Sequence, residues 1–184
     1  MDQYYTNDTH INTLPHRIFI SHSSDDVKYV SELVTLLYDM GLDETQVFCS
    51  SLPGYGIPIN KDIFDFLRKQ FNEYELHVMI VHSKNYYKSP VCLNEMGAAW
   101  VLHNECTSFL LPGFGFEDMK GVVNGNTIAV KLDNPEREVK DKLNQIYGVL
   151  AEEFELKKKN ETIWETKRDR FIEQIITIKS EKTE

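Results

Sequence analysis

The chain has 184 residues, 41% of them hydrophobic, which suits one globular domain with a full core and room for an appendage. Its formal net charge of −9 and its lack of a long basic run argue against nucleic acid as a partner. No apolar segment approaches the ~20 residues that span a bilayer, and the polar N-terminus does not resemble a signal peptide, so we expect no membrane association.

The cysteines and histidines indicate a reducing compartment and no metal. Cys49, Cys92 and Cys106 are odd in number and lack the spacing of a disulfide framework, which predicts reduced thiols and a cytoplasmic protein. His103-x-x-Cys106 has the spacing of two metal ligands, but no paired Cys/His motif accompanies it. We therefore expect no metal site.

The first part of the chain alternates between strand and helix patterns. The first helix pattern ends at Gly41, a residue suited to the position after a helix, and residues 50–60 form a loop rich in Pro and Gly. The predicted elements are strands at residues 17–21, 46–49 and 76–81, a helix over residues 25–40, and a helix capped by Asn60 that carries Ile63, Phe64, Leu67 and Phe71.

A third helix begins directly after the third strand and carries a conspicuous carboxylate, Glu95. Ser89 stands at the N-cap and Pro90 at the first helical position, and we expect the helix to run to about residue 104. The residues three and four positions from Glu95 are apolar or nearly so: Val91, Cys92, Ala98 and Ala99. A carboxylate with such neighbours loses hydration without a local partner, and such groups are often kept for chemistry. The alternative is that Glu95 points to solvent or meets a distant arginine.

The second part of the chain holds two further strands and two long helices. Strands are predicted at residues 109–111 and 127–132, and the loop between them has room for one helical turn near residues 117–122. The apolar stripes of the closing helices are Leu143, Ile146, Leu150 and Phe154 on the first, and Trp164, Phe171, Ile175 and Ile178 on the second. We divide the chain into an N-terminal tail (1–14), a domain (15–150) and a C-terminal helical extension packed on the domain (151–184).

Five strands that alternate with helices predict a flavodoxin-like α/β fold, with a parallel sheet in the order 2-1-3-4-5 and helices on both faces. Ligands bind such sheets at the switch point, which here lies between strands 1 and 3. Residues 21–25 follow strand 1, and the segment with Glu95 follows strand 3, so the two should face each other across one crevice. Alternatively, Ser24 or Asp25 only caps the first helix.

Two motifs carry a family resemblance. The run FISHSSD (residues 19–25) resembles the first box of Toll/interleukin-1 receptor (TIR) domains in its prokaryotic form. The pattern SxNYxxSxxCxxE (residues 83–95) resembles the segment that bears the catalytic glutamate of enzymatic TIR domains. Residues 50–60 correspond in place to the family's BB loop, with Pro53-Gly54 at its turn. The resemblance covers about residues 15–150.

The sequence also departs from the receptor and adaptor branch of that family. No Arg-Asp pair precedes Pro53-Gly54, and the Phe-Trp pair of the third box is absent near residues 127–132. These departures argue against a pure receptor adaptor.

The resemblance implies cleavage of the nicotinamide–ribose bond of NAD⁺, with NAD⁺ as substrate and no cofactor. Nicotinamide leaves as a neutral base, so no strong general acid is needed, and the ribose becomes oxocarbenium-like. Glu95 is implied as the catalytic carboxylate that stabilises this positive charge. The implied substrate-binding residues are Phe19, Ser21, His22, Ser50, Asn85, Tyr86, Ser89 and Cys92.

A compact prokaryotic TIR protein of this kind resembles the signal-producing component of Thoeris anti-phage systems. That resemblance implies an ADP-ribose-derived, cyclic messenger, a separate effector protein that responds to it, and self-association through TIR–TIR contacts. Two alternatives stay open. One is a non-catalytic TIR interaction or adaptor module, including a virulence protein that mimics host adaptors. The other is an enzyme like the nucleoside deoxyribosyltransferases, which share the fold type and a catalytic glutamate.

Overall fold

The computed structural model describes residues 14–49, 63–102, 105–121 and 128–182. These residues contain a five-stranded sheet in the order β2-β1-β3-β4-β5, and every neighbouring pair is parallel. The strands are β1 (His16–Ser21), β2 (Val47–Cys49), β3 (Glu75–His82), β4 (Glu105–Leu110) and β5 (Ile128–Lys131). The predicted α/β fold and its strand order are confirmed.

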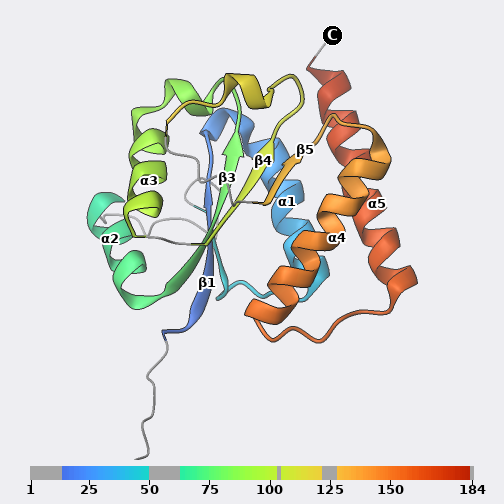
Figure 1. Ribbon diagram of the computed structural model, residues 1–184, viewed down its shortest axis with the longest axis horizontal. Coiled ribbons are helices and arrows are strands. Elements are labelled where there is room, and N and C mark those ends of the chain that lie inside the picture. The colour runs from blue at the N-terminus through green and yellow to red at the C-terminus, as the bar shows by residue number, and fades with distance from the viewer. Residues whose placement is uncertain (1–13, 50–62, 103–104, 122–127, 183–184) are drawn as a thin grey trace, which may run out of the picture.

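Helices cover both faces of the sheet (Figure 1). On one face lie α2 (Ile63–Glu73) and α3 (Pro90–Val101), and on the other α1 (Val27–Met40), α4 (Glu136–Glu153) and α5 (Glu161–Glu181). Each face has its own hydrophobic cluster, because alternate strand residues point to opposite sides. Ile18 and Ile20 of β1 belong to the cluster under α1, α4 and α5, whereas Phe19 belongs to the cluster under α2 and α3.

The fourth strand runs from Glu105 to Leu110, so it begins four residues before the strand predicted at residues 109–111 and ends one residue earlier. Its two buried polar residues, Thr107 and Ser108, have partners on β3. The Thr107 hydroxyl lies 2.8 Å from His77 Nε2, and the Ser108 hydroxyl lies 3.1 Å from His82 Nε2. A buried hydroxyl with a hydrogen-bond partner costs little, so these residues stay in the strand.

Two residues predicted to mark the ends of helices, Ser89 and Gly41, do so in the structure. Ser89 is the N-cap of α3, and its hydroxyl accepts a hydrogen bond from the Cys92 N–H at 3.3 Å. Gly41 follows α1 with a φ of 121°, a conformation that favours glycine. The third helix ends at Val101, three residues before its predicted end. A short 3₁₀ turn at Phe116–Asp118 lies close to the turn predicted at residues 117–122.

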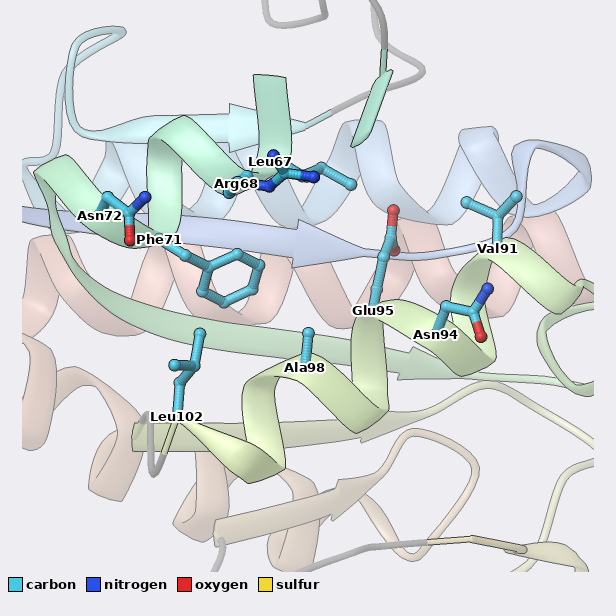
Figure 2. Close-up of a pocket in the computed structure, with 9 residues that line it drawn as sticks. All are labelled: Leu67, Arg68, Phe71, Asn72, Val91, Asn94, Glu95, Ala98 and Leu102. Carbon is cyan, nitrogen blue, oxygen red and sulfur yellow. The ribbon is translucent and has the colours of Figure 1, made fainter. Parts of the chain in front are cut away.

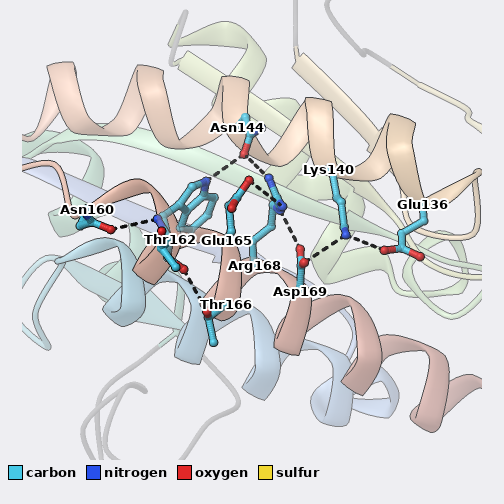
Figure 3. Close-up of polar contacts among 10 residues, drawn as sticks. Glu136, Lys140, Asn144, Asn160, Thr162, Glu165, Thr166, Arg168 and Asp169 are labelled. Atoms are coloured by element: carbon cyan, nitrogen blue, oxygen red, sulfur yellow. Dashed lines mark hydrogen bonds and ion pairs between the residues drawn. The ribbon is translucent and has the colours of Figure 1, made fainter.

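The two C-terminal helices are joined by a polar network (Figure 3). Arg168, on α5, is buried, and its guanidinium donates to Asn144 of α4 and to Asp169, each at 2.9 Å. The Trp164 indole also donates to Asn144, at 2.8 Å. Lys140 of α4 donates to Asp169 at 3.0 Å. Buried apolar residues of α5, Phe171 among them, complete the cluster on this face of the sheet.

Several sequence predictions fall outside the described residues. They are the helix cap at Asn60, the loop over residues 50–60 with Ser50, and His103 of the His-x-x-Cys pair. Within the described parts of the chain, no helix combines the length and apolar character that crossing a membrane requires.

We expect Phe171→Ala to lower the free energy of unfolding by about 3–5 kcal/mol, because it empties a buried aromatic site on α5. Urea denaturation monitored by circular dichroism measures this loss. Ile176→Ala, at an exposed position of the same helix, is the control and should change stability by less than about 0.5 kcal/mol. Equal effects of the two substitutions would show that α5 does not stabilise the fold through this cluster.

Candidate active site

Glu95 is buried at the switch point of the sheet, with only 5% of its surface exposed. It lies on the second turn of α3, which follows β3, and it faces the end of the neighbouring strand β1. The Ser21 hydroxyl, at the last position of β1, donates a hydrogen bond of 2.6 Å to Glu95 Oε2. The carboxyl is therefore removed from water and fixed by one hydroxyl from the adjacent strand.

The fully buried side chain of Tyr86 supports the Ser21–Glu95 pair through its contact with Ser21. The Tyr86 hydroxyl lies 3.0 Å from Ser21 Oγ and donates to the Cys92 carbonyl at 2.9 Å. Burial raises the pKa of Tyr86, so the phenol keeps its proton at neutral pH. Tyr86 thus connects the end of β1 to the first turn of α3, one turn before Glu95.

Burial also changes the acidity of Glu95. Loss of hydration raises the pKa of Glu95 to about 7, and the hydrogen bond from Ser21 opposes part of that rise. Near neutral pH the group therefore exists in both protonation states. A carboxyl tuned in this way, inside a cleft, is typical of catalytic sites.

Two cavities meet at Glu95. The first is polar, has a volume of about 390 Å³ and lies between the β1 loop and the start of α3. The second is mainly apolar, has a volume of about 370 Å³ and lies between α2 and α3 (Figure 2). Glu95 and Val91 line both. Both volumes fall within the roughly 300–1,000 Å³ of small-molecule sites.

The structure brings most of the predicted site residues together. His22, Asn85, Ser89 and Cys92 line the polar cavity with Glu95, as the predicted crevice between strands 1 and 3 requires. Ser21 and Tyr86 lie behind that wall and act through hydrogen bonds.

Phe19 is not brought to either cavity. Its ring is fully buried and stacks on Phe48 at a centroid distance of 5.3 Å, with Phe71 edge-on at 6.2 Å. Phe71 in turn lines the apolar cavity, so Phe19 supports that wall from the core. Ser50, the remaining predicted residue, lies outside the described residues.

His22 and Cys92, which line the polar cavity, are both uncharged at neutral pH. Burial lowers the pKa of His22, whose Nδ1 lies 3.2 Å from the Ile20 carbonyl, so the imidazole is uncharged at neutral pH. Burial raises the pKa of Cys92, and its thiol donates to the His22 carbonyl at 3.4 Å. A protonated thiol is a poor nucleophile, so Cys92 is not activated for nucleophilic attack.

Asp26, which the sequence analysis did not predict as a site residue, lines neither cavity but supports the polar one through its hydrogen bonds. It is buried, and its carboxylate accepts hydrogen bonds from Ser83 and from Asn85, the latter at 3.0 Å. The alternative that Ser24 or Asp25 caps the first helix is wrong. Neither the 3₁₀ turn Ser24–Asp26 nor α1 has a side-chain hydrogen bond at its N-cap. One signal was present: Asp26 lies four residues before buried Val30, on the apolar side of the helix.

The apolar cavity is also lined by α2, a helix to which the sequence analysis assigned no site residue. Its α2 side is formed by Leu67, Arg68, Phe71 and Asn72. Within the described ranges, no group of three or more His, Cys, Asp or Glu side chains is arranged to hold a metal ion.

No family model matches the chain. The chain is similar to an uncharacterized protein of Bacillus subtilis (strain 168), YddK, with 41% identity over 142 residues. The matched segment is 76% of this chain and 53% of that protein, so the chain spans about half the length of this relative. The similarity extends over most of the chain but brings no activity with it.

We expect Glu95→Gln to stabilise the protein, and the gain to grow with pH. Glu95 holds its proton in the folded state up to about pH 7, whereas the ordinary value is 4.5, so stability is lost as pH rises between these values. Above pH 7 the gain should approach about 3 kcal/mol, and below pH 4 it should vanish. Urea denaturation at pH 4, 6 and 8 measures it.

Glu173→Gln, at an exposed position on α5, is the matched control and should have no pH-dependent effect. A Glu95→Gln protein whose stability follows the wild type at every pH would contradict the burial of an ionisable carboxyl at this site.

Proposed function

We propose that this protein cleaves the nicotinamide–ribose bond of NAD⁺, with Glu95 as the catalytic carboxylate. The observation that carries the proposal is the placement of Glu95: a buried carboxyl in the wall shared by a polar and an apolar cavity. A dinucleotide with an aromatic base attached to a ribose has the same division into an apolar ring and a polar sugar. The motifs around Ser21 and Glu95, which resemble those of enzymatic TIR domains, support the same substrate.

The proposed chemistry depends on charge stabilisation. The nicotinamide ring enters the apolar cavity between α2 and α3, and its ribose lies against Glu95. When the C–N bond breaks, its electron pair goes to the ring nitrogen, the pyridinium becomes neutral nicotinamide, and positive charge develops on the ribose. The ionised Glu95 stabilises that charge, and the buried surroundings of the carboxylate strengthen the attraction.

The polar cavity holds the remainder of the substrate in this proposal. Asn85 and Ser89 offer hydrogen bonds to sugar hydroxyls, and the exposed ammonium of Lys88 lies on the same wall for a phosphate. Ser21 keeps one carboxylate oxygen of Glu95 oriented, which leaves the other for the ribose.

The product and the biological setting belong to the same proposal. The resemblance to Thoeris components favours a cyclic ADP-ribose derivative that acts as a messenger for a separate effector, in a cytoplasmic enzyme that self-associates through TIR–TIR contacts. Hydrolysis of the ribosyl cation by water gives linear ADP-ribose instead. Mass spectrometry of the products from NAD⁺ separates the two.

One observation favours a second candidate, a non-catalytic interaction module. The outer side of α3 carries exposed apolar residues at helical spacing, with Leu93, Trp100 and Val101 exposed by 37%, 49% and 63%. Such a surface suits contact with another protein. Under this candidate, Glu95→Gln leaves binding to the partner intact and NAD⁺ is inert.

We expect Glu95→Gln to reduce NAD⁺ cleavage by about a hundredfold to a thousandfold, because the neutral amide cannot stabilise the ribosyl cation. Release of nicotinamide, followed by liquid chromatography at saturating NAD⁺, measures the loss. Glu173→Gln is the control and should retain full activity, since Glu173 is exposed on α5. Equal rates for the two variants would exclude the assignment of Glu95.

We expect the cleavage rate to rise with pH and to level off above about pH 7, because the active form of Glu95 is the carboxylate. Ser21→Ala removes the hydrogen bond that favours this form, and should move the midpoint of the profile upward by about one pH unit. Single-turnover rates from pH 5 to pH 9 measure the midpoint. A lower midpoint in Ser21→Ala would show that another group controls the profile.

A further inference from the structure

The C-terminal end of α5 reaches the site from the opposite side of the sheet. In Figure 1 α5 ends on the side toward which β3 points, and the polar cavity lies at that end of the strands. Lys182, just after α5, lies with its ammonium 3.7 Å from Asp26 Oδ1 and 4.8 Å from the centre of the Tyr29 ring. Glu181 accepts a hydrogen bond of 3.0 Å from Lys28.

Asp26 is an unusual residue for such a contact, because it is 2% exposed. Both of its carboxylate oxygens are used. Oδ2 accepts from the Ser83 hydroxyl, and Oδ1 accepts from the Asn85 amide at 3.0 Å. Asp26 lies in the loop after β1 and its two donors lie in the loop after β3, so the carboxylate joins the two loops that flank the switch point.

The hydrogen bonds continue from Asp26 through Ser83 and Tyr86 to the residues around Glu95. Ser83 Oγ accepts from the Tyr86 N–H at 3.0 Å, which fixes the 3₁₀ turn Tyr86–Lys88. The Tyr86 hydroxyl contacts Ser21 and the Cys92 carbonyl, and Asn85 lines the polar cavity directly. A shift of Asp26 would therefore move Asn85 and loosen the support of Ser21.

We propose that Asp26 is a positioning residue for the polar cavity, and that Lys182 holds it in place by supplying a positive charge. The end of α5 then belongs to the scaffold of the site. A buried carboxylate is stable only when paired or fully hydrogen-bonded, and removal of one partner leaves an uncompensated charge. The kinetic part of this inference rests on the proposed cleavage of NAD⁺, and a structural measurement tests it independently.

The experiment compares Lys182→Met with Lys28→Met in the full chain. Lys28, at the start of α1, pairs with Glu181 at the end of α5. Lys182, just after α5, pairs with Asp26. We expect Lys182→Met to raise KM for NAD⁺ by about fivefold, with a smaller change in kcat, because the cavity wall rather than Glu95 is disturbed. Lys182→Arg should restore KM, and Lys28→Met should leave it unchanged.

Hydrogen exchange of the Tyr86 amide gives a readout that needs no activity. This N–H donates to Ser83, which Asp26 holds, so Lys182→Met should accelerate its exchange several-fold while Lys28→Met leaves it alone. If the wild type does not cleave NAD⁺, the proposed function fails, and the exchange rates still decide the role of Lys182.

A double-mutant comparison tests whether Lys182 acts through Asp26. Asp26→Asn alone should raise KM and accelerate exchange at Tyr86 more than Lys182→Met does, since it disturbs every partner of the carboxylate. Added to Asp26→Asn, Lys182→Met should change KM by less than about twofold. Independent, multiplicative effects of the two substitutions, or identical behaviour of Lys182→Met and Lys28→Met, would overturn the proposal.

Discussion

The hydrogen bond from Ser21 to Glu95 is the interaction on which the site depends. It joins the end of the first strand to the helix that follows the third, so it spans the point where the strand order reverses. The carboxyl it holds is buried, and its lost hydration is only partly replaced by one hydroxyl. This buried carboxyl lies where a polar and an apolar cavity meet, so it lines both of them.

The strand order was predictable because each strand is followed by a helix pattern that reaches the next strand, and parallel strands need such crossovers. Boundaries were harder. The polar first half of β4 gave no strand signal, since Thr107 and Ser108 are tolerated only through their contacts with His77 and His82 on the neighbouring strand. Such contacts arise between residues distant in sequence, so no local pattern contains them.

The crevice and the burial of Glu95 were also within reach of the sequence, because topology brings the two loops together and the helical neighbours of Glu95 are apolar. The finer arrangement was not. Phe19 has the pattern of both a core residue and a pocket residue, and only the rings of Phe48 and Phe71 decide between them. Asp26 resembled one more acidic residue at a helix start, and its role depends on donors almost sixty residues away.

The sheet separates two hydrophobic clusters whose side chains do not mix. Both cavities lie on the side of α2 and α3 or at the edge of the sheet, whereas α1, α4 and α5 pack the other face. Substitutions that reshape the apolar cavity, at Leu67 or Ala98 for example, therefore leave the packing of Phe171 and its neighbours untouched. In evolutionary terms, the ligand preference of such a protein can diversify by mutation of two helices while the opposite layer preserves foldability.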